Sequence, residues 1–142
     1  MKILLDTCAL SEIISPKGSD SLKHYVARCA PDDVFLSVVT LGEIMKGVEL
    51  LPSGKRKLDL QFSLNALQVE FDNRIVPVTP DIAILWGKIL AREKKRGHNL
   101  PAIDVLLAAT AIANGLVLVT RNTKDFEQTG AQLINPWIPG KE

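Results

Sequence analysis

Two patterns of hydrophobic positions alternate along the chain. Short unbroken apolar runs predict strands that are buried on both faces of a sheet. Between them, apolar residues recur every three to four positions, which predicts helices with one buried face. The predicted strands are Ile3–Leu5, Val34–Val39, Ile75–Val78, Leu116–Val119 and Gln132–Ile134. The predicted helices are Ala9–Ile14, Leu22–Cys29, Leu41–Val48, Leu60–Phe71, Pro80–Arg96 and Pro101–Ala113.

Capping residues support this division of the chain. Ser19 or Asp20 is expected to cap the second helix, and Thr79 followed by Pro80 to begin the fifth. Because strands and helices alternate strictly, we predict a single domain with a three-layer α/β/α fold around a parallel sheet of about five strands. In such sheets, ligands bind at the carboxyl ends of the strands. Polar residues that follow a predicted strand are therefore the first candidates for a functional site.

Composition narrows the class of protein. The 142 residues are 46% hydrophobic and 23% charged, which is ordinary for one globular domain spanning residues 1–142. No run approaches the roughly 20 apolar residues of a membrane span, so we expect a cytoplasmic protein without a membrane anchor. The two cysteines, Cys8 and Cys29, are too few for a disulfide framework or a zinc motif, and we expect buried free thiols. The net charge of +1 means that any nucleic-acid-binding face must concentrate its positive charge locally.

Four acidic residues stand out, and each also has a purely structural interpretation. Asp6 ends the first strand and is equally suited to cap the following helix. Glu43 fits a capping box in which Thr40 caps the helix and Glu43 bonds back to it. Asp104 lies in the first turn of the most apolar helix, where a buried charge is costly without a cation or several donors. Asp125 follows the Leu116–Val119 strand and is also a typical turn residue.

Taken together, these acids favour a metal site. Three of the four lie at strand ends or at the helix starts that follow, so one edge of the sheet is expected to collect them. Repelling carboxylates are tolerated when a cation neutralises them. A set of oxygen ligands without a convincing His or Cys partner points to Mg²⁺ or Mn²⁺. Asn122 offers a further neutral oxygen near Asp125.

The same residues carry a resemblance to a known family. Leu5-Asp6-Thr7, Thr40-x-x-Glu43, Ile103-Asp104 and Thr120-Arg121-Asn122-x-x-Asp125-Phe126 resemble, in this order, the motifs of PIN-domain ribonucleases. Within that family the chain is most similar to the VapC-type and FitB-like toxins of toxin–antitoxin pairs, over nearly its whole length.

The resemblance implies a metal-dependent endoribonuclease in which Asp6, Glu43, Asp104 and Asp125 are the catalytic and metal-binding residues. It places supporting hydroxyls at Thr7 and Thr120, and it places Asn122 where some relatives carry another acid, which leaves the occupancy of a second metal position open. It also implies a homodimer, and a small antitoxin that covers or invades the active site. The motif residues that support the site are Thr7, Thr40, Thr120 and Asn122.

Binding of RNA requires cations beside the acids. Arg121 and Lys124 flank Asp125 and are the first candidates. Lys94–Arg96 with His98 form a second group, although a basic last turn also suits the C-terminus of a helix. Trp137-Ile138-Pro139 either packs back on the fold or binds a partner.

Two other classes of function compete with this interpretation. A phosphatase or receiver domain also places an Asp after its first strand, but the further acids that these proteins need are missing, since Cys8 stands where such a phosphatase has a second Asp. A PIN-like binding module that has lost catalysis is the remaining alternative, and the four retained acids argue against it.

Overall fold

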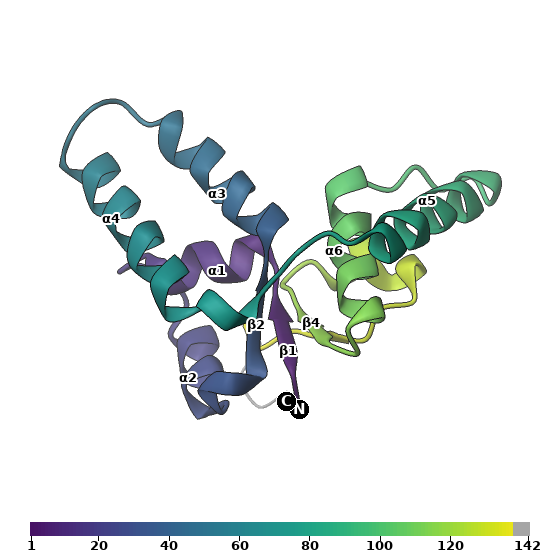
Figure 1. Cartoon of the computed structure of the whole chain (residues 1–142), viewed down its shortest axis with the longest axis horizontal. Coiled ribbons are helices and arrows are strands. Elements are labelled where there is room, and N and C mark those ends of the chain that lie inside the picture. Colours follow the sequence, from purple (N-terminus) through teal and green to yellow (C-terminus); the bar gives the residue numbers. More distant parts are fainter. Residues whose placement is uncertain (138–142) are drawn as a thin grey trace.

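The computed structural model describes residues 1–137 and has a parallel five-stranded sheet with helices on both faces (Figure 1). The strand order is β3-β2-β1-β4-β5, and every neighbouring pair is parallel. The predicted α/β/α fold is therefore confirmed. The strands are β1 (Ile3–Leu5), β2 (Val34–Ser37), β3 (Ile75–Val76), β4 (Val117–Val119) and β5 (Leu133–Ile134). The helices are α1 (Thr7–Ile14), α2 (Asp20–Arg28), α3 (Val38–Glu49), α4 (Lys55–Glu70), α5 (Pro80–Lys95), α6 (Ala102–Ala113) and α7 (Thr123–Phe126), with short 3₁₀ helices η1 (Pro31–Asp33), η2 (Asp72–Arg74) and η3 (Glu127–Thr129).

Alternate residues of the central strand enter two different cores. Ile3 and Leu5 pack with the buried residues of α1–α4, whereas Leu4 packs with Ala108, Ala111 and other residues on the opposite face. This alternation follows from the side-chain period of two in a strand. The unbroken apolar run of β1 thus reflects a strand that is covered on both sides, as predicted.

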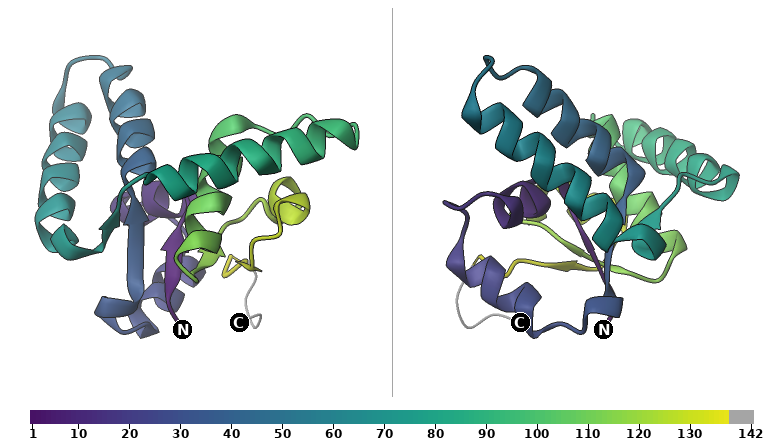
Figure 2. Two further views of the ribbon diagram at one scale, coloured as in Figure 1. Left: turned by 45° about the vertical axis from the view of Figure 1, so that its right-hand side comes forward. Right: turned by 60° about the vertical axis from the view of Figure 1, so that its left-hand side comes forward.

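The chain reverses its direction of progress across the sheet at β1. From β1 it moves outward through β2 to β3, and it then returns to place β4 on the other side of β1. Such a switch point opens a crevice at the carboxyl ends of the two strands. Figures 1 and 2 show the α3–α4 hairpin on one side of this edge and the α5–α6 pair on the other. The residues after β1 and β4 therefore lie at the base of a V-shaped arrangement of helices.

Two predicted boundaries are wrong for local reasons. Val38 and Val39 continue the apolar run of the second strand, but they form the first turn of α3 because the Ser37 hydroxyl caps that helix by accepting a hydrogen bond from the Val39 N–H, at 3.1 Å. The segment around Asp125, expected as a loop, forms the short helix α7. The pairing of the third strand stops at Val76, directly before Pro77, as expected for a residue without an N–H.

Other expectations for the chain have mixed outcomes. Ser19 caps α2 and Thr79 caps α5, as predicted, through hydrogen bonds from Leu22 and Ile82. Both cysteines are free, but they are half-buried rather than fully buried. Within residues 1–137, no helix combines the length and the apolar character needed to cross a membrane.

Candidate active site

Asp6 is the best-defined member of the acidic group. It follows β1 directly, its side chain is only 4% exposed, and its Oδ1 accepts a hydrogen bond of 2.7 Å from the Ala9 N–H at the start of α1. Burial raises the pKa of this carboxyl, and the bonds from Ala9 and Thr120 and the charge of Arg121 partly oppose that rise. The structural role predicted for Asp6, that of a helix cap, is therefore confirmed. Only one of its oxygens is used in the cap.

Glu43 lies across the crevice from α1, on α3. The Thr7 hydroxyl donates a short hydrogen bond to Glu43 Oε1, and the Thr7 and Thr40 hydroxyl oxygens lie 3.4 Å apart. The capping-box interpretation of Thr40 and Glu43 is wrong, because Ser37 caps α3 and Thr40 is fully buried inside it. Glu43 is thus held by a hydroxyl from the α1 side of the crevice, and α3 does not need it for capping.

Asp104 and Asp125 form the other half of the group. Asp104 is half-buried in the first turn of α6, and Asp125 is exposed on α7. Burial raises the pKa of Asp104 most, and the negative charges of Asp125, Glu43 and Asp6 raise it further. Asp104 therefore feels all three of the other acids. The charges of three acids from separate parts of the sequence therefore reach Asp104 at the switch point of the sheet.

The donor set suits a hard divalent cation. Carboxylate and hydroxyl oxygens predominate, and oxygen ligands are those that Mg²⁺ and Mn²⁺ prefer. The repulsion that raises the pKa of Asp104 is the kind of interaction that a bound cation relieves. Among residues 1–137, no three His, Cys, Asp or Glu side chains stand close enough together to hold one ion as they are. The negative charges of three acids therefore act on Asp104, but in the described residues the acids do not stand close enough together to coordinate one ion.

Arg121 is the cation that acts on Asp6, and it is already engaged by other groups. Its guanidinium lies 3.5 Å from Glu12 Oε2 and 5.7 Å from the centre of the Trp137 ring. The Trp137 indole N–H donates to the same Glu12 oxygen at 2.7 Å. Trp137 therefore packs back on the fold, whereas Ile138 and Pro139 lie outside the described residues. The other predicted RNA-binding cation, Lys124, is exposed on α7.

A groove runs away from this acidic group between α1, α3 and α4. Its volume is about 930 Å³, and Thr7 and Glu43 line it together with residues of the three helices. Its apolar lining includes Ile14, Ile44, Val48, Leu51 and Leu60, and its cationic lining residues are Lys17, Lys55 and Arg56. The groove is thus mostly apolar, and it is continuous with the Glu43 side of the site.

Comparison with known proteins identifies the family and supports the fold. The family profile described as the PIN domain matches residues 3–132. This chain belongs to the PIN-domain family. Toxin FitB of Neisseria gonorrhoeae is 33% identical to it over 95% of this chain and 98% of FitB. The VapC ribonuclease Y4jK of Sinorhizobium fredii is 30% identical over 96% of this chain and 99% of the relative. The crystal structure of FitAcB from N. gonorrhoeae has a TM-score of 0.88 at 33% identity, and the match covers 95% of this chain and 98% of that one.

Membership of the PIN family confirms the resemblance that the motifs suggest. The roles of Asp6, Glu43, Asp104 and Asp125 as ligands and of Arg121 and Lys124 as RNA contacts remain predictions. Sequence reasoning missed two acids that the fold uses, Glu12 beside Arg121 and Glu93 near the end of α5. Glu93 has a signal that was available, since it is an acid surrounded by the basic residues Arg92, Lys94, Lys95 and Arg96.

Proposed function

We propose that this PIN-domain protein is a Mg²⁺- or Mn²⁺-dependent endoribonuclease that acts in the cytoplasm as the toxin of a toxin–antitoxin pair. The observation that carries the proposal is the placement of four acids at the carboxyl edge of the sheet, after β1, in α3, in the first turn of α6 and in α7 after β4. The names of relatives support the substrate class, since Y4jK is a VapC ribonuclease and another relative, 31% identical, is a tRNA(fMet)-specific endonuclease.

The four acids would have different roles in hydrolysis. A bound divalent ion supplies an acidified water and neutralises charge on the leaving oxygen. Asp6 and Asp104 would hold the ion directly, and Asp125 would hold it directly or through water. Glu43, oriented by the Thr7 hydroxyl, would bind the ion or its water and accept the proton that the attacking water loses. No side chain of the protein needs to act as a nucleophile.

The negative RNA backbone must be balanced close to these acids. Arg121 and Lys124 flank Asp125 in sequence and are the proposed phosphate contacts. Because Arg121 contacts Glu12 and the Trp137 ring, its guanidinium would bind a phosphate from a fixed position. Lys124 is exposed and adjusts to the substrate on its long side chain.

Metal-dependent cleavage tests the proposal. Purified chain, freed of any co-purified partner, is incubated with a mixed RNA pool in Mg²⁺ or Mn²⁺ and in chelator. We expect cleavage with either metal and none in chelator. We also expect a loss of at least about a hundredfold in Glu43→Gln, because even partners outside the ligand shell of a metal cost 10- to 100-fold. Absence of cleavage together with absence of metal binding would instead support a PIN-like binding module without catalysis.

The proposed antitoxin binds in the groove between α1, α3 and α4. The groove is mainly apolar, which suits an apolar peptide segment better than a phosphodiester chain. It also ends at Thr7 and Glu43, so an occupant covers one side of the active site. Relatives solved as complexes, such as FitAB bound to a DNA fragment, support a protein partner of this kind.

Two leucines of α4 provide a matched test of this docking site. Leu60 lines the groove, whereas Leu58 is 65% exposed and does not line it. With the antitoxin encoded beside this gene, Leu60→Gln is expected to weaken inhibition of the ribonuclease about 10- to 100-fold, as for an interface anchor. Leu58→Gln is expected to leave inhibition unchanged. Equal inhibition of both variants would place the antitoxin elsewhere. Light scattering of the same samples tests whether the chain is the homodimer that the resemblance implies.

A further inference from the structure

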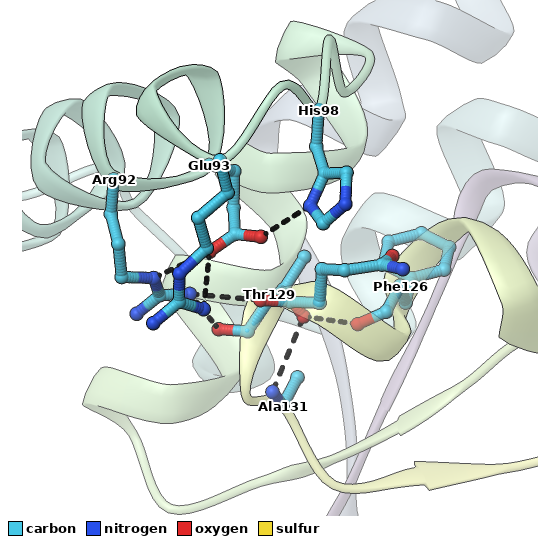
Figure 3. Close-up of polar contacts among 8 residues, drawn as sticks. Arg92, Glu93, His98, Phe126, Thr129 and Ala131 are labelled. Carbon is cyan, nitrogen blue, oxygen red and sulfur yellow. Dashed lines mark hydrogen bonds and ion pairs between the residues drawn. The ribbon is translucent and has the colours of Figure 1, made fainter.

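A buried carboxylate lies behind the Asp104 and Asp125 half of the site. Glu93, in the last turn of α5, is 0% exposed. Its Oε1 lies 2.9 Å from His98 Nδ1, and its Oε2 accepts hydrogen bonds from Arg92 Nε at 2.7 Å and from Arg96 at 3.1 Å (Figure 3). Its backbone carbonyl also accepts the His98 N–H at 2.8 Å. Both carboxylate oxygens and the carbonyl of this one residue therefore have partners.

The burial of Glu93 demands an explanation beyond packing. A carboxylate removed from water is costly unless charged donors compensate it, and an apolar residue of similar size would fill the same space without that cost. Here the cost is met, because His98 and then Arg92 hold the pKa of Glu93 below its ordinary range. A group that stays ionised while buried can orient several donors at once. The positions of Arg92 and His98 show which parts of the chain Glu93 can orient.

One donor extends the network to the turn after Asp125. Arg92 uses Nε for Glu93 and donates from its Nη2 to the Gln128 carbonyl at 2.8 Å and, more weakly, to the Thr129 carbonyl at 3.5 Å. The Thr129 hydroxyl in turn donates to the Phe126 carbonyl at 2.5 Å and accepts the Ala131 N–H at 3.2 Å (Figure 3). A continuous chain of hydrogen bonds thus runs from Glu93 to Phe126, the residue after Asp125.

A second branch of the Glu93 network reaches His98, four residues before the start of α6. His98 belongs to the connection between α5 and α6, and Glu93 fixes both its ring and its N–H. Independently of Glu93, the Trp86 indole, seven residues earlier in α5, donates to the Ala102 carbonyl at 2.9 Å. Asp104 follows two residues later, in the first turn of α6. The two ends of the α5–α6 connection are therefore fastened to α5.

We propose that Glu93 is a positioning residue that, through Arg92 and His98, holds the turns carrying Asp104 and Asp125 at a fixed separation. The inference rests on the proposed function in treating these two acids as metal ligands. Glu93 does not touch the site itself. It sets the geometry of one half of the site relative to α5, while Thr7 and α3 hold the other half.

Arg92 and Arg96 offer a matched pair of variants. Both donate to the same oxygen of Glu93, but only Arg92 continues to η3. Hydrogen exchange of two backbone amides, measured without metal, reports on these turns. The Asp125 N–H donates to the Asn122 carbonyl, and the Ala131 N–H donates to the Thr129 hydroxyl. Binding of Mn²⁺, followed by the paramagnetic resonance of the free ion, reports on the site.

In Glu93→Gln and Arg92→Gln we expect these two amides to exchange at least about tenfold faster, and Mn²⁺ affinity to fall about 10- to 100-fold. In Arg96→Gln we expect less than about a threefold change in either. The amide of Asp6, bonded to the Val119 carbonyl in the sheet, serves as an internal reference that all variants leave unchanged.

The two proposals fail in different ways. Unchanged exchange and unchanged Mn²⁺ affinity in Arg92→Gln would overturn the positioning role, and so would equal effects in Arg92→Gln and Arg96→Gln, which would indicate simple charge balance. A wild-type chain that binds no Mn²⁺ would instead overturn the proposed function, and the exchange measurement would still decide whether Glu93 controls the two turns. Arg92→Gln keeps the test valid if Glu93→Gln does not fold.

Discussion

Asp104→Asn is expected to abolish RNA cleavage while making the metal-free protein more stable. The substitution removes a charge but keeps the size and hydrogen-bonding capacity of the side chain. Loss of a direct metal ligand is expected to lower the cleavage rate by more than about a hundredfold, because partners outside the ligand shell already cost 10- to 100-fold. Undiminished metal-dependent cleavage by this variant would remove Asp104 from the site.

The gain in stability follows from the sign of the pKa shift. Burial, and then the charges of Asp125, Glu43 and Asp6, raise the pKa of Asp104 in the folded state above its ordinary value of 3.8. The folded state therefore binds the proton more tightly than the unfolded state does. Stability is lost as pH rises from 3.8 through the folded-state pKa, and above it the ionised Asp104 destabilises the fold. Asn behaves like the protonated acid and avoids this loss.

Thermal unfolding in chelator measures the effect. At neutral pH we expect Asp104→Asn to melt roughly 2–4 °C above the wild type, the size of a modest single-site gain in a domain of this length. The difference should disappear below about pH 3.8, where the acid is protonated in both states. Asp59→Asn is the control, because Asp59 is exposed and pairs with the exposed Lys55 side chain, so that cleavage should not fall and stability should not rise. A lower melting temperature for Asp104→Asn would contradict the proposed repulsion.

The sequence predicts features that depend on local chemistry. A buried strand requires an unbroken apolar run, and helix caps require short polar side chains, so β1 and the caps at Asp6, Ser19 and Thr79 were predictable from the sequence. The order of the strands was not predicted, but a parallel sheet was. The gathering of acids at the carboxyl edge follows from the parallel sheet, because parallel strands deliver the residues after them to one side.

Features that depend on a choice between two local structures, or on a partner far away in the sequence, could not be predicted from the sequence. Val38 and Val39 are good strand residues, and only the competing cap by Ser37 places them in α3. Thr40 and Glu43 satisfy the capping-box spacing, yet the actual partner of Glu43 is Thr7, 36 positions away. The basic residues around Glu93 are a signal in the sequence, but its link through Arg92 to Gln128 of η3, 36 positions from Arg92, is not.

Two substitutions of Asp6 are expected to separate its contribution to stability from its proposed role in catalysis. Asp6→Ala and Asp6→Asn both remove the charge, so both are expected to lose cleavage by more than about a hundredfold. They differ in the cap. Asn retains an oxygen for the Ala9 N–H and caps helices about as well as Asp, whereas Ala leaves that N–H without its partner.

Comparison of the two variants therefore isolates the cap of α1. In chelator, Asp6→Ala is expected to be less stable than Asp6→Asn by about 1 kcal/mol, within the 0.5–2 kcal/mol range of helix caps, as measured by urea unfolding. Ser19→Ala removes the corresponding cap of α2, from the Leu22 N–H, and should lose a similar free energy of unfolding without losing cleavage. If Asp6→Asn were as unstable as Asp6→Ala, the hydrogen bond from the Ala9 N–H to residue 6 would not contribute to stability. If Asp6→Asn cleaved RNA normally, Asp6 would be a cap alone, and the metal would have to be held by the remaining three acids.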